Sequence, residues 1–135
     1  MRLLPTTLIL GILLCLPNAA FAARPIENLL DMAISARADG TPRTLEEVRK
    51  GIILGCNAKG WTPADDGDQK IQATILVRGK HYVEVSIPFT ETTYSILYVS
   101  SRNMDYDEKK QKIHRKYSAW VGNLSAAIQR EFGLN

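Results

Sequence analysis

Cysteine is scarce in this chain of 135 residues, which contains two. Cys15 lies in an apolar stretch near the amino terminus, and Cys56 is the other. If the amino-terminal stretch is removed, Cys56 is left alone, and one cysteine excludes a disulfide within the chain. Stability must then come from packing. Cys56 falls in an apolar helical segment, where a thiol behaves as a small hydrophobic side chain.

A strong excess of charge is also missing. The chain has 17 basic and 14 acidic residues, a formal net charge of +3, which is too near neutral to indicate a polyanionic partner. Long apolar runs are missing as well. The longest, residues 8–16, spans about 9 residues, whereas a membrane-spanning helix needs about 20. We therefore expect no transmembrane segment in the mature chain.

Residues 1–22 have the three parts of a secretory signal peptide. Arg2 precedes the apolar run, and Ala20 and Ala22 supply the small residues before a cleavage site. A lipid-anchored alternative would use Cys15, but Leu14 precedes it where a small residue is expected. We expect an exported protein, periplasmic or secreted, and no tether through Cys15.

The rest of the chain divides into an extension and one domain. Residues 23–43 hold Pro25, Gly40 and Pro42 among scattered apolar residues, a pattern that fits either a short helix or an extended segment. Residues 44–135 have the usual size of a domain with its own core. We expect residues 44–135 to form a single α+β domain.

The domain begins with a predicted helix. Thr44 and Glu47 form a capping box ahead of an apolar stripe, and Lys59-Gly60 supplies the stop. Gly51 and Gly55 lie one turn apart inside this helix, although a helical glycine costs about 1 kcal/mol relative to alanine. We expect the helix backbone to approach another element closely there, and we take that element to be the sheet.

Strands follow, because apolar and polar residues alternate and aromatic and β-branched residues are enriched. Pro63 cannot donate a hydrogen bond to a neighbouring strand, so the first strand should lie at an edge. We place the second turn at Gly79-Lys80 and expect an antiparallel meander. The predicted strands are residues 61–64, 71–77, 82–87 and 94–99.

A second helix closes the chain. Asp105 and Glu108 offer an amino-terminal cap after a polar stretch, and Gly133 offers the stop. An apolar stripe at helical spacing should pack on the sheet. The stripe consists of Ile113, Tyr117, Trp120, Val121, Leu124, Ile128 and Phe132.

Together these elements predict an α+β two-layer sandwich. An antiparallel meander of three to four strands would carry both helices on one face, because an antiparallel sheet can leave its other face to solvent.

Several segments resemble a family of small, uncharacterised exported bacterial proteins, periplasmic or lipoprotein-like. The resemblance covers roughly residues 44–132 and rests on Lys59-Gly60-Trp61, the tyrosine-rich segment 94–98, residues 101–106 and residues 113–121. It implies an α-β-meander-α fold and export. It implies no catalytic residue.

Motifs for catalysis and for known cofactors are missing. The chain has no Gly-x-Ser-x-Gly elbow and no phosphate-binding glycine loop. Asp65, Asp66 and Asp68 surround Gly67, but Leu76 stands where a calcium loop needs its closing glutamate. We therefore expect a solvated hairpin turn there, no metal, no cofactor and no catalytic residue.

A competing hypothesis is a small envelope enzyme or a metal-dependent protein. It would use His81, His114 and Cys56, which include the only two histidines of the chain. Convergence of the three side chains in a pocket would favour this hypothesis, and their dispersal would favour a binding protein.

Our leading prediction is a non-catalytic binding module of the bacterial cell envelope. Its partner would be an envelope protein, a lipid or a cell-wall ligand. The order helix, strands, helix also resembles a double-stranded RNA-binding domain, but export argues against a nucleic acid. Two surfaces are candidates, the open sheet face and the basic start of the last helix. The candidate residues are Tyr82, Glu84, Lys109, Lys110, Lys112, Arg115 and Lys116.

Overall fold

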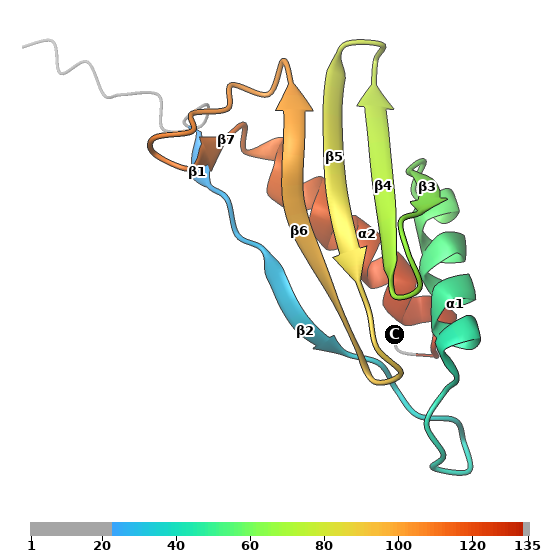
Figure 1. Ribbon diagram of the computed structural model, residues 1–135. Helices are drawn as coiled ribbons and strands as arrows, with labels where there is room; N and C mark the ends of the chain where they lie inside the picture. Colours follow the sequence, from blue (N-terminus) through green and yellow to red (C-terminus); the bar gives the residue numbers. More distant parts are fainter. Residues whose placement is uncertain (1–22, 134–135) are drawn as a thin grey trace, which may run out of the picture.

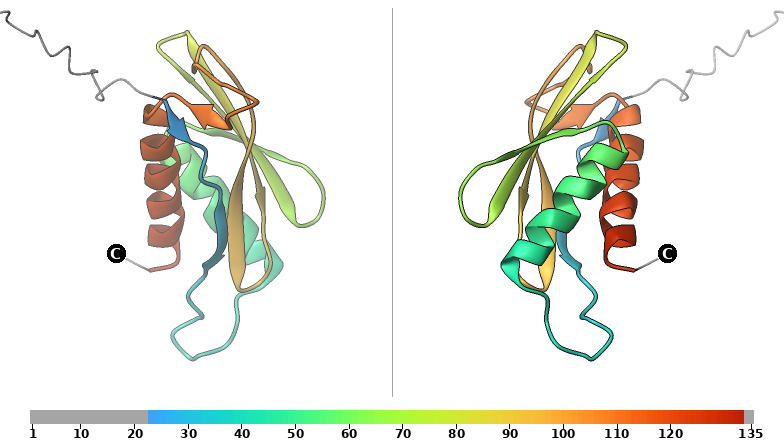
Figure 2. Two further views of the ribbon diagram at one scale, coloured as in Figure 1. Left: turned by 90° about the vertical axis from the view of Figure 1, so that its left-hand side faces the viewer. Right: turned by 90° about the vertical axis from the view of Figure 1, so that its right-hand side faces the viewer.

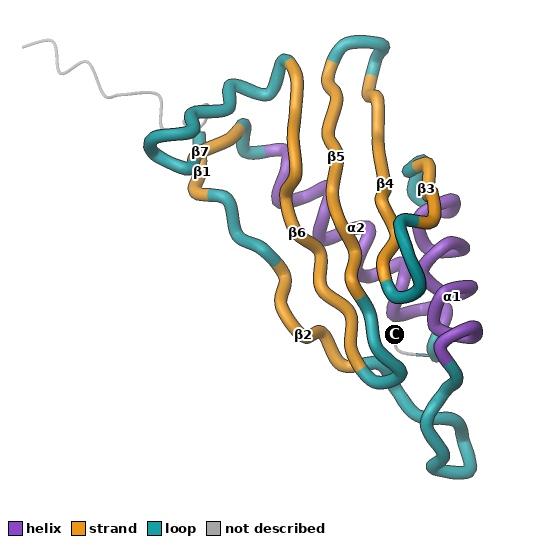
Figure 3. Tube along the Cα trace, in the orientation of Figure 1, coloured by secondary structure: helices purple, strands orange, loops and turns teal. Residues whose placement is uncertain are grey.

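The computed structural model describes residues 23–133, so the predicted signal peptide lies outside the described range. Figure 1 shows the order of the elements along the chain, and Figure 3 separates helices from strands by colour. The helices are α1 (Leu45–Ala58) and α2 (Lys116–Glu131). The strands are β1 (Arg24–Pro25), β2 (Leu29–Ala33), β3 (Thr62–Asp65), β4 (Lys70–Val77), β5 (His81–Pro88), β6 (Thr93–Arg102) and β7 (Lys112–Ile113).

The larger sheet has five antiparallel strands in the order β2-β6-β5-β4-β3. A second sheet pairs β1 with β7. Figure 2 views the larger sheet from its edges and shows α2 running along one side of it, with α1 beside α2. The α+β sandwich predicted from the sequence is confirmed.

The core lies between the sheet and the helices. Alternate residues of β4 and β5 are buried, as the period of two predicts, and these include Ile71, Ala73, Val83, Val85 and Ile87. Their neighbours along the two strands are half-buried or exposed. One face of the sheet therefore packs on the helices and the other meets solvent.

The segment before the first helix is extended. Its strand β2 pairs with β6, with Met32 opposite Tyr94. This pairing widens the expected meander to five strands and makes β2 one edge of the sheet. At the other edge lies β3, as Pro63 predicts. β2 also has an irregular register near Asp31, whose φ is 48°.

Helix α1 begins and ends where the sequence predicts. The Oγ1 atom of Thr44 accepts a hydrogen bond from the backbone N–H of Glu47 at 3.2 Å. After Ala58 the chain leaves the helix through Gly60, whose φ of 78° favours glycine.

The two glycines of α1 face α2, and the expectation that they face the sheet is wrong. A Cβ atom on Gly55 would lie 2.8 Å from the backbone Cα of Ile128. A Cβ atom on Gly51 would meet the ring of Phe132. The glycines therefore allow the two helices to pack closely beside each other in one layer.

The start of α2 also differs from the prediction. Ile113 lies in β7 opposite Arg24, and the helix begins at Lys116 with no side-chain cap at Arg115. Asp107 bonds instead to its own neighbourhood, because its Oδ1 atom accepts from Lys110 N–H and its backbone pairs with Lys112. This turn takes the place of the expected capped first turn.

The turn between β4 and β5 is shifted by one residue from the prediction. Arg78 and Gly79 are its two central residues, with φ values of 56° and 65°. Positive φ at both positions is the mark of a type I′ turn, which suits the twist of an antiparallel hairpin. Arg78 is consequently held at the tip of the hairpin.

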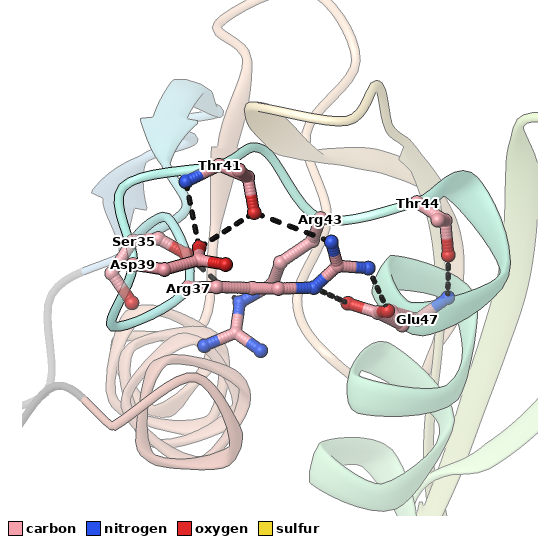
Figure 4. A network of polar contacts seen from close by, with 7 residues as sticks. All are labelled: Ser35, Arg37, Asp39, Thr41, Arg43, Thr44 and Glu47. Atoms are coloured by element: carbon pink, nitrogen blue, oxygen red, sulfur yellow. Dashed lines mark hydrogen bonds and ion pairs between the residues drawn. The ribbon is translucent and has the colours of Figure 1, made fainter.

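A polar network ties the loop before α1 to both helices (Figure 4). Arg37 donates from its Nε and Nη2 atoms to the two carboxylate oxygens of Glu47 on α1. Arg43 donates to Ser35 O at 2.9 Å and to Phe132 O at 3.3 Å. Because Phe132 follows the last turn of α2, the Arg43 contact satisfies a carbonyl that the helix leaves unpaired.

Candidate functional site

A cleft lies between the β4–β5 turn and the first two turns of α2. Its volume is about 370 Å³, within the range of small-ligand sites. Residues from the sheet, from the loop after β6 and from α2 surround it. They are Val77, Arg78, His81, Met104, His114, Lys116, Ala119, Trp120 and Asn123.

Local structure explains why these residues meet. Val77 and His81 are partners in the β4–β5 register, and both share the inward face of their strands with Val83. Lys116, Trp120 and their cleft-lining neighbours on α2 have the spacing i, i+3, i+4 and i+7, so they form one helical face. The cleft lies at the end of the sheet that carries the β4–β5 turn, beside the start of α2.

The two histidines of the chain lie side by side in this cleft. Their ring centroids are 6.4 Å apart, with an angle of 39° between the ring planes. The Nδ1 atom of His81 lies 2.7 Å from Asn103 O, which can only accept a hydrogen bond. The backbone N–H of Lys116 donates to the Nδ1 atom of His114 at 3.2 Å.

These two contacts fix opposite tautomers. His81 must carry its proton on Nδ1, so a neutral ring keeps a lone pair on Nε2. His114 accepts at Nδ1, so its proton is on Nε2. Within residues 23–133, neither Nε2 atom has a hydrogen-bond partner. The cleft thus offers a ligand one acceptor nitrogen and one donor nitrogen.

The charge of the cleft has one sign. Arg78 and Lys116 line it, and no carboxylate is among the lining residues. Neither side chain belongs to an ion pair in the described part of the chain. Asn123 adds an amide on the same side as Lys116. Two cationic side chains without a carboxylate partner favour an anionic ligand.

The floor of the cleft is apolar. Met104 is 1% exposed and belongs to the core, and Val77 and Ala119 add further apolar atoms. Trp120 is half-buried here. It packs against the core, as the stripe predicts, but it is less deeply buried than Tyr117 and Val121.

Cys56 lies apart from the two histidines. It is fully buried in the core on α1 and does not line the cleft. Burial raises the pKa of its thiol to about 12, so the reactive thiolate is strongly disfavoured near neutral pH. The described residues also contain no group of three or more side chains able to hold a metal. The suggested trio of His81, His114 and Cys56 therefore converges only in its histidines.

The open sheet face carries Tyr82 and Glu84. Arg102 on β6 places its guanidinium carbon 4.1 Å from the centre of the Tyr82 ring, a cation–π contact. Glu84 accepts a hydrogen bond from the Ser100 hydroxyl at 2.9 Å. These side chains lie on the opposite side of the sheet from the histidine cleft, so the two surfaces are separate.

The residues of the basic cluster come from three successive parts of the chain. Lys109 and Lys110 are exposed in the turn before β7, and Lys112 lies within that strand opposite Pro25. Arg115 and Lys116 begin α2 and line a shallow hollow of about 210 Å³ with Arg24. Of the cluster, Lys116 alone also lines the histidine cleft.

Three polar or aromatic residues of the cleft were not selected as site residues from the sequence, namely Arg78, Trp120 and Asn123. The signal for Arg78 was the glycine that follows it, because Arg-Gly at a hairpin tip fits the two positive φ positions. The signal for the helix residues was their spacing from Lys116. For His81, the alternation that buries Val83 predicts an inward side chain two residues earlier.

Comparison with known proteins adds no relative: no family model, no curated protein and no solved structure matches the chain. Within residues 23–133, no helix has the length and apolar character needed to cross a membrane.

Proposed function

We propose that this chain is an exported, non-catalytic binding module of the bacterial cell envelope that holds an anionic ligand in the cleft between the β4–β5 turn and α2. One observation carries the proposal. Arg78, Lys116 and the Nε2–H group of His114 surround an apolar floor with no carboxylate among the lining residues. Such a site is concave, mostly apolar and equipped with a few convergent polar groups.

The compartment rests on the predicted signal peptide in residues 1–22 and on the resemblance to exported bacterial proteins. A ligand of the envelope fits both. The open sheet face with Tyr82 and Glu84 is less suited to hold a small ligand, because Arg102 already covers the Tyr82 ring.

The test is a binding titration of purified protein with benzoate, phenyl sulfate and phenyl phosphate, followed by tryptophan fluorescence. Trp120 lines the cleft, whereas Trp61 is 2% exposed in the core and serves as a constant background. We expect saturable quenching by at least one anion. Lys116→Gln should weaken it roughly tenfold, since a hydrogen bond to a charged group contributes about 1.5–3 kcal/mol.

The matched control is the double variant Lys109→Gln with Lys110→Gln. It removes more positive charge than Lys116→Gln, but from an exposed turn that does not line the cleft. Unchanged affinity in this control places the anion in the cleft. An equal loss in both variants, or no saturable binding of any anion, would reject the proposed function.

A second candidate function is favoured by the opposite tautomers of His81 and His114. Nε2 of His81 could take a proton from an attacking water while Nε2–H of His114 donates a hydrogen bond to the negative charge that develops on the ester oxygen. Release of p-nitrophenol from p-nitrophenyl phosphate, lost in His81→Asn and in His114→Gln, would support catalysis. Binding without turnover would support the non-catalytic module.

A further inference from the structure

We infer that the ligand of the cleft is a phosphate monoester with an apolar substituent, an inference that rests on the proposed function and narrows it. The shared chemistry is a phosphate group joined to an apolar group, whether in a soluble ester or in the headgroup of phosphatidic acid. Three features of the cleft carry the inference: its donors, its histidine acceptor and its apolar floor.

The donors come from three elements of the fold. Arg78 belongs to the hairpin tip, His114 to the segment after β7 and Lys116 to the first turn of α2. A tetrahedral oxyanion presents oxygens in several directions and can accept from all three. A carboxylate can also accept from three donors, but its lone pairs lie in one plane, so it matches donors that converge from three elements less well than a tetrahedral group does.

The acceptor is the Nε2 atom of His81. Its lone pair is available to accept because Nδ1 donates to Asn103 O at 2.7 Å and Nε2 has no hydrogen-bond partner among residues 23–133. A phosphate monoester loses its second proton near about pH 6, so one proton can be shared between a phosphate oxygen and Nε2 near neutral pH. A sulfate ester carries no such proton, and its oxygen would meet the lone pair directly. The cleft should therefore select phosphate over sulfate.

The apolar floor requires more than a bare phosphate. Met104, Val77 and the half-buried Trp120 line the same cleft as the cationic groups. A bare phosphate would leave this surface wet, whereas an attached apolar group would remove it from water at about 25 cal/mol per Å². The volume of about 370 Å³ is at the lower end of ligand sites, so the apolar group in the cleft is small.

The decisive experiment compares phenyl phosphate with phenyl sulfate at neutral pH by fluorescence titration or calorimetry. We expect phenyl phosphate to bind about tenfold more tightly, because one hydrogen bond to a charged group is gained and one lone-pair clash is avoided. Equal or tighter binding of phenyl sulfate overturns the inference while leaving the anion-binding function standing. Binding of neither ester overturns the inference, and it overturns the proposed function as well if benzoate also fails to bind.

The variant His81→Asn tests the source of the preference. Its amide keeps a donor near the position of Nδ1 and removes Nε2. We expect the preference for phosphate to fall to less than about threefold, because phenyl phosphate loses a hydrogen bond and phenyl sulfate no longer meets the lone pair. A preference that persists in a folded His81→Asn variant overturns the role of His81. Its circular dichroism spectrum and melting temperature show that the variant is folded.

Two further arms examine the apolar group and its source. Phenyl phosphate should bind at least tenfold more tightly than inorganic phosphate. Trp120→Ala should reduce this ratio. Binding to this variant is measured by calorimetry, because the variant lacks the fluorescent reporter. Equal affinities would overturn the apolar part. Vesicles of phosphatidylcholine with phosphatidic acid should capture the protein if the source is a lipid. If phenyl phosphate binds to the protein but the vesicles do not capture it, the source of the phosphate group is a soluble ester.

Discussion

Gly55 of α1 and Ile128 of α2 are in direct backbone contact. A Cβ atom on Gly55 would lie 2.8 Å from both the N and the Cα atoms of Ile128. Because those atoms belong to the helix backbone, no side-chain rotation can make room. The two helices can therefore pack this closely only with glycine at this position.

Gly55→Ala should lower the free energy of unfolding by roughly 3 kcal/mol, the upper part of the usual cost of overpacking. Gly51→Ala should cost less, because its Cβ would meet the ring of Phe132 rather than backbone. Denaturant unfolding measures both changes.

The control is Gly122→Ala on the exposed side of α2. A Cβ atom there would meet nothing within 4 Å, so the higher helix propensity of alanine should stabilise the protein by about 1 kcal/mol. A destabilised Gly122→Ala variant, or a Gly55→Ala variant as stable as the parent protein, would contradict the packing described for the two helices.

The hydroxyl of Tyr117 is buried and has no hydrogen-bond partner among residues 23–133. Tyr117→Phe should therefore leave the free energy of unfolding unchanged or raise it by about 1 kcal/mol, because an unsatisfied polar group is removed. Tyr94→Phe is the matched comparison. The Tyr94 hydroxyl lies 2.6 Å from Ser125 Oγ, so its loss should cost about 1 kcal/mol. If Tyr117→Phe were the less stable of the two variants, the Tyr117 hydroxyl would have a hydrogen-bond partner.

Cys56 should make the free energy of unfolding decrease with rising pH in the alkaline range. Its pKa rises from 9.0 to about 12 on burial. Above pH 9.0 the unfolded thiol ionises first, so stability should fall by roughly 1.4 kcal/mol per pH unit for this group as pH approaches the folded value. Cys56→Ala should be less stable at neutral pH by a constant packing term and should show a shallower alkaline decline. Identical slopes, or rapid maleimide labelling of native Cys56, would contradict its burial.

The ion pair between Arg37 and Glu47 makes stability depend on acidic pH. The hydrogen bond from Arg37 is the largest cause that lowers the pKa of Glu47. The ion pair therefore stabilises the fold above the pKa of an unfolded glutamate, about 4.3. This stabilisation is lost as the pH falls through the lower pKa that Glu47 has in the folded protein. Glu47→Gln should unfold more easily at neutral pH and lose part of the acid dependence. Thermal melts at pH values above and below the pKa of Glu47 measure both effects. If the acid dependence of the melting temperature is unchanged in Glu47→Gln, the ion pair does not contribute to stability.

Local patterns predicted most of the fold. The alternation in residues 71–77 and 82–87 gave the central hairpin, and Thr44 with Glu47 gave the start of α1. These signals are local because a strand period or a helix cap involves neighbouring residues. β2 was not assigned because its partner lies far along the chain and its own register is irregular at Asp31.

The candidate site was predicted only in parts. His81 and His114 were selected as residue types, but their proximity depends on how the end of the sheet meets α2, which no spacing in the sequence specifies. The run of basic residues predicts Lys116 as a site residue, but it does not predict that Lys116 lines the same cleft as the histidines. The spacing of Trp120 predicts its packing against the core, but nothing in that spacing indicates that the same ring also lines a cleft.

The edge position of β2 links proteolytic processing to self-association. β2 pairs with the first part of β6, from Thr93 to Ile96, and separates that part from the edge of the sheet. A protease that cut after Ala33 would release the covering strand and uncover a row of unpaired backbone donors and acceptors, the usual template for intermolecular strand pairing. Trimmed protein should therefore sediment as larger species than the uncut chain. On this expectation, the segment that follows the predicted signal peptide protects the sheet from pairing with a strand of another molecule.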